Sequence, residues 1–186
     1  AVTSYYADRG APIEPAQVVL TASTSEAYAH VFRLLGDPGD SFLVPRPSYP
    51  LFEPLAALEA VRLDPWPLRY DGRWWLDREA LERALTPRTR GLILVEPNNP
   101  TGSCLSPAEA AYADALAPAR GLPLIVDEVF GDFLPGDTPR RSTWAAPGGA
   151  ALTFVMSGLS KVCGLPHLKL GWIVVAGPES ARADAL

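Results

Sequence analysis

The chain has 186 residues, of which 48% are hydrophobic and 20% are charged, and its formal net charge is −5. This composition is typical of a globular domain with a sizeable core, and the absence of a basic block argues against nucleic acid as the main partner. No apolar run reaches transmembrane length, and the first residues do not resemble a signal peptide, so we expect a cytoplasmic protein without a membrane partner. Cys104 and Cys163 match no zinc spacing, so both are expected to be free thiols, and no metal site is predicted.

The sequence predicts strands that alternate with helices along the chain. Short apolar runs of strand character occur at residues 17–22, 41–45, 60–66, 91–96, 122–126, 152–157 and 170–176. Helical patterns precede or follow these runs at residues 1–9, 23–35, 52–58 and 76–85, after Ser106, and from Pro178. Residues 71–75 (DGRWW) are expected to form a turn. Such alternation is typical of an α/β domain with a mostly parallel sheet.

Several helix starts carry capping residues. Asp77 is expected to cap the helix that follows it, and Ser106 with Glu109 has the spacing of a capping box.

In the helix at residues 23–35, one stripe is predicted to face the core with a second stripe beside it. The first stripe is Ala27, Val31 and Leu34, and the second is Tyr28, Phe32 and Leu35.

Polar and aromatic residues follow the ends of several predicted strands. They are Ser23, Thr24, Ser25, Tyr49, Asn98, Asn99, Asp127, and the stretch 157–161. In parallel sheets, ligands bind beyond the carboxyl ends of the strands, so these groups are expected to converge. The hydroxyl residues at 23–25 precede a helix, where free backbone N–H groups favour an anion. Plain N-capping is the alternative reading of the same residues.

The two lysines of the chain, Lys161 and Lys169, lie in one stretch, whereas the other fourteen basic residues are arginines. An amine can lose its proton and attack a carbonyl, which a guanidinium does not do. The chain has no dinucleotide-binding, P-loop or hydrolase-elbow motif, and His30 and His167 have no ligand spacing. An amine, a carboxylate, an amide, an aromatic face and an anion cradle together fit a phosphorylated aromatic aldehyde such as pyridoxal 5′-phosphate.

Four motifs carry a resemblance to a known family. They are PSYP at residues 47–50, NNPTG at 98–102, VDEVF at 126–130, and SxxSK followed by KLG at 157–171. Their order and spacing resemble those of the class I and II (fold-type I) aminotransferases, from about Tyr5 to the end of the chain. The resemblance implies a three-layer α/β sandwich around a mostly parallel seven-stranded sheet, like the large domain of aspartate aminotransferase.

The resemblance also implies roles for individual residues toward pyridoxal 5′-phosphate. Lys161 would form the aldimine and carry the proton between the substrate and the cofactor. Asp127 would pair with the pyridine nitrogen, Asn99 would donate to the ring oxygen, and Tyr49 would stack on the ring. The phosphate would be held by Ser23, Thr24, Ser25, Ser160, Lys169 and, less favoured than Ser160, Ser157.

Three residues depart from the family pattern. Phe130 stands where most members have a tyrosine that bonds the ring oxygen, so the aldimine pKa is expected to be higher. Lys169 replaces the phosphate arginine and loses its bidentate fork. Ser23 stands where relatives commonly have glycine.

The resemblance implies an amino-acid aminotransferase, acting on an amino acid and a 2-oxo acid and assembling as a homodimer. We expect residues 1–14 to be a helix end and linker, 15–178 the cofactor-binding large domain, and 179–186 the start of a linker helix to an absent small domain. A pyridoxal phosphate lyase or decarboxylase on the same fold, or a non-catalytic cofactor-sensing domain, remains an alternative.

Overall fold

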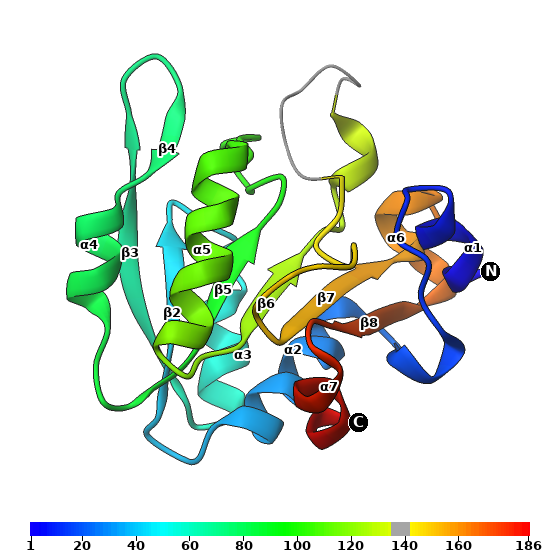
Figure 1. The fold of residues 1–186 in the computed structure, drawn as a ribbon, viewed down its shortest axis with the longest axis horizontal. Coiled ribbons are helices and arrows are strands. Elements are labelled where there is room, and N and C mark those ends of the chain that lie inside the picture. The colour runs from blue at the N-terminus through cyan, green and yellow to red at the C-terminus, as the bar shows by residue number, and fades with distance from the viewer. Residues whose placement is uncertain (135–141) are drawn as a thin grey trace.

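Eight strands form one hydrogen-bonded sheet in the computed structural model, which describes residues 1–134 and 142–186 (Figure 1). The strands are β1 Val18–Thr21, β2 Ser41–Arg46, β3 Arg62–Tyr70, β4 Trp74–Leu76, β5 Thr89–Val95, β6 Leu124–Asp127, β7 Thr153–Gly158 and β8 Gly171–Ala176. Their order across the sheet is β1-β8-β7-β6-β5-β2-β3-β4. The five strands from β7 to β3 run parallel, whereas β1, β8 and β4 pair antiparallel. The predicted α/β domain with a mostly parallel sheet is confirmed.

Helices cover both faces of this sheet and produce the expected three layers. The α-helices in the described ranges are α1 Val2–Ala7, α2 Thr24–Leu35, α3 Phe52–Leu58, α4 Arg78–Ala84, α5 Pro107–Ala119, α6 Leu159–Val162 and α7 Glu179–Ala185. Three short 3₁₀ turns join them, η1 Pro15–Gln17, η2 Gly131–Phe133 and η3 Pro166–Leu168. α5 lies across one face and α2 and α3 across the other (Figure 1). No helix in those ranges is both long enough and apolar enough to cross a membrane.

The core consists of two apolar clusters, one on each face of the sheet. β5 shows how a single strand serves both clusters. Leu92 and Leu94 pack on the side of α5, whereas Ile93 and Val95 pack on the side of α2. Because side chains alternate along a strand, a strand covered on both faces must be apolar throughout. This explains the uninterrupted apolar run of β5 and its central position between β2 and β6.

The sheet has eight strands rather than the predicted seven, because the expected turn at residues 71–75 contains the start of β4. Trp74, Trp75 and Leu76 pair antiparallel with the end of β3. The pair forms a hairpin that extends from the rest of the sheet (Figure 1). A strand of three residues is too short to show a period of two, so the sequence pattern did not distinguish it from a turn.

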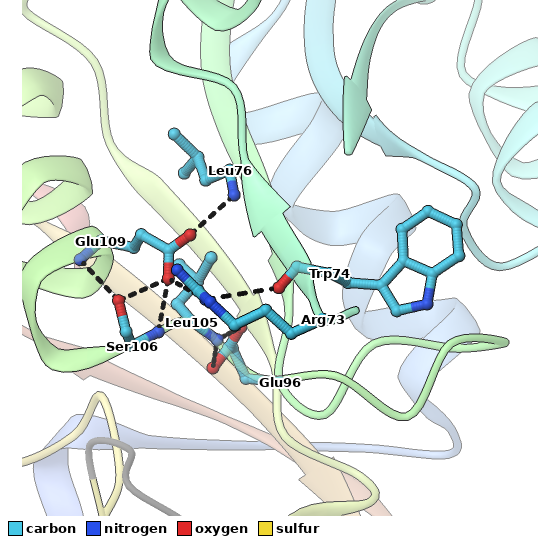
Figure 2. Close-up of polar contacts among 7 residues, drawn as sticks. All are labelled: Arg73, Trp74, Leu76, Glu96, Leu105, Ser106 and Glu109. Atoms are coloured by element: carbon cyan, nitrogen blue, oxygen red, sulfur yellow. Dashed lines mark hydrogen bonds and ion pairs between the residues drawn. The ribbon is translucent and has the colours of Figure 1, made fainter. Parts of the chain in front are cut away.

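A buried carboxylate, Glu109, anchors this hairpin to the start of α5 (Figure 2). The predicted capping box is present, since the Ser106 hydroxyl accepts from the Glu109 N–H, and the Glu109 carboxylate accepts from the Ser106 N–H. The same carboxylate accepts from the backbone N–H of Leu76 at 2.8 Å and from the Arg73 guanidinium at 3.3 Å. Burial raises the pKa of Glu109, but the hydrogen bonds outweigh it and the pKa lies below its usual value. One residue therefore joins a helix start to an edge hairpin.

The buried residues of α2 come from both of the predicted stripes. Ala27, Tyr28, Val31 and Phe32 are buried, whereas Leu34, predicted to face the core, is 55% exposed. Ser23 caps this helix, because its hydroxyl accepts a hydrogen bond from the N–H of Glu26. The helix begins directly beyond the end of β1, at the carboxyl edge of β7 and β6.

Candidate active site

A cavity of about 150 Å³ lies at the carboxyl ends of the central strands. It gathers eight of the eleven predicted site residues, which are Ser23, Thr24, Tyr49, Asn99, Asp127, Phe130, Ser160 and Lys161. The remaining lining residues are Val95, Val129, Gly158 and Leu170. The convergence predicted from strand ends is thus present in the structure, with residues drawn from positions 23 to 170 of the chain.

Asp127 ends β6 and is the buried carboxylate of the cavity, with 6% of its surface exposed. Its two oxygens have different donors. The N–H of Val129 donates to Oδ1 at 3.0 Å, and the hydroxyl of Tyr28 donates to Oδ2 at 3.2 Å. Burial raises the pKa of Asp127 to about 6, although both hydrogen bonds act to lower it. The carboxylate is therefore in an environment that favours a cationic partner.

The amine of Lys161 reaches the cavity from α6, a single helical turn directly after β7. Its Nζ lies 5.4 Å from the centroid of the Phe130 ring, within the range of a cation–π contact. Phe130 in turn packs edge-on against Phe133, with the ring centroids 6.0 Å apart. The amine and the aromatic ring thus occupy the same wall of the cavity.

Two glycines allow close backbone approaches beside the cavity, Gly171 to the N-terminus of α2 and Gly158 to Leu170. A Cβ atom on Gly171 would lie 2.9 Å from the carbonyl carbon of Ser23 and 3.1 Å from the backbone nitrogen of Thr24. A Cβ atom on Gly158 would lie 2.8 Å from the carbonyl oxygen of Leu170. Real Cβ atoms essentially never lie closer than 3.0 Å to such neighbours, so the distance of 2.9 Å to Ser23 means that the glycine of the KLG motif is required for β8 to approach the helix start.

Asn98 fixes the two loops that present Tyr49 and Asn99. Its side-chain amide donates to the carbonyl of Pro47 at 3.1 Å and to the hydroxyl of Thr101 at 2.9 Å. The first bond reaches the PSYP loop and the second stays within the NNPTG loop. Sequence reasoning singled out Asn99 for a role and gave none to its neighbour, although two consecutive asparagines before a proline were the available signal. Tyr49 packs edge-on against Phe52, with ring centroids 5.6 Å apart.

Three predicted site residues do not line the cavity. Ser25 lies in the first turn of α2 and is half-buried. Ser157 is fully buried in β7, and its hydroxyl has no hydrogen-bond partner among the described residues. Lys169 is exposed in a left-handed conformation at the end of η3. Of the two serines before the lysine, the favoured one, Ser160, is the one that lines the cavity.

Tyr28 is a residue of the site that sequence reasoning placed in the core. The helical pattern correctly predicted a buried side chain, but the pattern contains no information about where a buried hydroxyl points. Glu128, which follows Asp127, faces elsewhere and accepts hydrogen bonds from the hydroxyl of Thr143 and the N–H of Trp144. The cavity therefore combines one amine, one buried carboxylate, an amide, two aromatic rings and a helix N-terminus, which can bind an aromatic, anionic carbonyl compound.

Comparison with known proteins finds similarity to aminotransferases, both in a family model and in individual relatives. The family model described as aminotransferase class I and II matches residues 1–183. The chain is 36% identical over 173 residues to a probable N-succinyldiaminopimelate aminotransferase, DapC, of Mycobacterium tuberculosis, covering 89% of this chain and 43% of that protein. It is 30% identical over 174 residues to the tyrosine aminotransferase of Bos taurus, covering 94% and 39%.

Solved structures show the same likeness. An alanine aminotransferase from Pyrococcus furiosus superposes with a TM-score of 0.88 at 26% identity, over 99% of this chain and 47% of that one. The N-succinyldiaminopimelate aminotransferase structure from Mycobacterium tuberculosis gives a TM-score of 0.84 at 34% identity, over 99% and 49%. The chain thus spans less than half the length of each of these relatives.

Proposed function

Because the chain belongs to the class I and II aminotransferases, we propose that it is the cofactor-binding part of an amino-acid aminotransferase that uses pyridoxal 5′-phosphate. The observation that carries the proposal is the single cavity that unites the amine of Lys161 with the buried carboxylate of Asp127. Its reaction would transfer the amino group of an amino acid to a 2-oxo acid.

The residues of the cavity fit this cofactor. Asp127 is buried, its pKa is raised to about 6, and in the described ranges no lysine or arginine forms an ion pair with it. A protonated ring nitrogen would supply the positive charge that such a carboxylate favours. The backbone N–H groups at the start of α2, with the hydroxyls of Thr24 and Ser160, would hold the phosphate. Ser25, Ser157 and Lys169, the other residues expected to hold the phosphate, do not line the cavity.

When bound, pyridoxal phosphate supplies an aldehyde for the amine and a ring that withdraws electrons from the substrate's α-carbon. Lys161 would hold the cofactor covalently through Nζ and then use the freed Nζ as the base that takes the α-proton. Asp127 would keep the proton on the ring nitrogen. Asn99 would donate to the ring oxygen and Tyr49 would cover the ring face, whereas Phe130 has no hydroxyl with which to add a second hydrogen bond.

We further propose the domain limits given by the sequence, with a cofactor-binding domain at residues 15–178 preceded by a helix end and linker. Residues 179–186, which include α7, would begin a linker helix toward a further domain, and the relatives above are more than twice as long as this chain. A homodimer and a cytoplasmic location complete the proposal. The substrate pair would be an amino acid and a 2-oxo acid.

The decisive experiment adds pyridoxal phosphate to the 186-residue chain, follows the visible absorbance, and then reduces with borohydride and maps the modified peptide. We expect one label, on Lys161. Lys161→Ala should abolish the label, whereas Lys169→Ala, the matched control for loss of the other lysine, should retain it. A label that is absent, or that sits elsewhere, would refute the proposal.

A second measurement separates the alternative reactions. An aminotransferase converts the bound cofactor to its amine form when an amino acid is added, and a 2-oxo acid restores the original absorbance. A lyase or decarboxylase would release product without needing the 2-oxo acid. A cofactor-sensing domain would take the label on Lys161 but would react with neither compound.

A further inference from the structure

Tyr28 is a buried phenol on α2 whose hydroxyl bonds Asp127, a residue that lines the cavity. It is 1% exposed, and its hydroxyl donates to Oδ2 of Asp127 at 3.2 Å. The contact joins residues that are 99 positions apart in the chain. It therefore links the helix whose N-terminus faces the cavity to the strand that delivers the carboxylate.

The ring of Tyr28 is held in place by its neighbours. Its centroid lies 5.0 Å from that of Phe52, in an edge-on arrangement, and 5.8 Å from that of Phe32. Apolar surroundings on these sides leave the hydroxyl little freedom to move away from Asp127. Burial and the nearby Asp127 raise the pKa of Tyr28 well above its usual value, so the phenol keeps its proton and remains a donor.

The two donors to Asp127 act on different oxygens. The N–H of Val129 fixes Oδ1 and the Tyr28 hydroxyl fixes Oδ2, so together they set the plane of the carboxyl group. Each carboxylate oxygen can accept more than one hydrogen bond, so Oδ2 remains able to accept from a ligand in the cavity. Both bonds also favour the ionised form over the protonated one, against the effect of burial.

At a position that needs only apolar packing, a buried tyrosine is less favourable than phenylalanine. Phenylalanine would fill the same space without burying a hydroxyl, and a buried hydroxyl without a partner is destabilising. We propose that Tyr28 is a positioning residue that orients Asp127 and keeps it ionised for the ring nitrogen of the cofactor. This inference rests on the proposed function, and it adds to that function a residue that touches neither the cofactor nor the substrate.

The test compares Tyr28→Phe with Tyr6→Phe. Tyr6 is also fully buried, and within residues 1–134 and 142–186 its hydroxyl accepts one hydrogen bond, from Nε1 of Trp172 at 3.2 Å. Unlike Asp127, Trp172 does not line the cavity. Each variant loses one buried hydroxyl and keeps its ring. Circular dichroism checks that both variants fold, and titration with pyridoxal phosphate then measures the dissociation constant. We expect Tyr28→Phe to weaken binding roughly tenfold, the value of one hydrogen bond to a charged group, and Tyr6→Phe to leave it unchanged.

A second readout needs no cofactor. A ¹³C NMR titration of the Asp127 carboxyl group in the free chain is expected to show a higher pKa in Tyr28→Phe than in the wild type. The titratable groups around that carboxyl are the phenols of Tyr28 and Tyr49 and the amine of Lys161, whereas Glu128 faces Thr143 and Trp144. Tyr6→Phe should leave this titration unchanged.

The outcomes separate this inference from the proposed function. If borohydride labels Lys161 in the wild type while Tyr28→Phe matches the wild type in affinity and in carboxyl titration, the role of Tyr28 is refuted and the function stands. If Tyr6→Phe weakens cofactor binding as much as Tyr28→Phe does, the effect comes from a general loss of packing in the core. The positioning role of Tyr28 is then also refuted. If the wild type takes no label, the proposed function fails and the role fails with it, even where the carboxyl titration moves.

Discussion

Replacing Asp127 with asparagine is expected to stabilise the cofactor-free chain at neutral pH, although the proposed function needs this carboxylate. Asp127 is 6% exposed, and burial raises the pKa of its carboxyl group from 3.8 to about 6. A shift of about two units corresponds to about 3 kcal/mol of folding free energy where the group is ionised in both states. Asparagine has the same shape and can accept from Val129 while its amide donates to the Tyr28 oxygen, so the substitution removes chiefly the charge.

The direction of the pH dependence follows from the raised pKa. Below about pH 4 the carboxyl is protonated in the folded and the unfolded chain, so it costs no stability. Between about pH 4 and 6 the unfolded chain loses the proton more readily, so the wild type becomes less stable as the pH rises. Above about pH 6 both states are ionised and the full cost of about 3 kcal/mol persists.

Urea unfolding of the wild type and Asp127→Asn, without cofactor, measures this difference at a series of pH values. The variant's advantage should grow as the pH rises from about 4 and level off near pH 7, independently of any constant effect of the substitution. Asp40→Asn serves as a control whose stability should change with pH in the opposite direction. Hydrogen bonds from Arg90 and from the backbone N–H of Asp37 lower the pKa of Asp40. That carboxylate stabilises the fold above its unfolded pKa and stops doing so as the pH falls. A difference for Asp127→Asn that is flat, or that shrinks with rising pH, would contradict the reasoning.

Three further substitutions test other parts of the structure. Gly171→Ala should lower stability by about 1–3 kcal/mol in urea unfolding and weaken cofactor binding, because the added Cβ meets the backbone at the start of α2. A Cβ on Gly131 would meet no described atom within 4 Å, so Gly131→Ala should change neither stability nor cofactor binding. If Gly171→Ala and Gly131→Ala behave alike, the clash with the start of α2 is not the cause. Phe130→Tyr should move the pH midpoint of the visible absorbance of the cofactor-loaded chain down by about one unit, because the hydroxyl can donate to the ring oxygen. Phe133 does not line the cavity, so Phe133→Tyr should leave this pH midpoint unchanged. A midpoint that moves in neither variant would refute the expected hydrogen bond from position 130 to the ring oxygen. Glu109→Gln should cost about 1–3 kcal/mol in the same unfolding assay at pH 7. Since the pKa of Glu109 is lowered, this cost should shrink as the pH falls below about 4.5, and a cost that is independent of pH would show that the charge is not involved.

The parts of the fold that were predicted from sequence are those with a local signal. Apolar runs gave the central strands, and capping residues such as Ser106 gave helix starts to within a residue. Residues at strand ends converge because parallel strands end at the same edge, so Asp127 and Lys161 could be assigned to one site without knowledge of their contacts. The three residues of β4 lacked such a signal.

The details that the sequence pattern does not contain depend on side-chain direction or on loop conformation. Ser157 and Ser160 are similar in sequence, but Ser157 still belongs to the buried strand β7, whereas Ser160 lies in the turn beyond it. Lys169 sits in a left-handed conformation that follows a 3₁₀ turn, which no periodic pattern encodes. Tyr28 was correctly assigned to the core, yet its hydroxyl extends to Asp127.

The antiparallel pairing of β1 with β8, in which Val18 lies opposite Val174, has a consequence for the order of folding. Contacts between residues so far apart in sequence form late, because the loop that they close carries a large entropic cost. α2 starts three residues after β1, and its N-terminus rests against Gly171 of β8. The wall of the cavity that the start of α2 forms is therefore expected to be among the last parts of the molecule to form. A ligand bound there would act on the closing step, because it would hold the first and last strands of the chain together and slow unfolding.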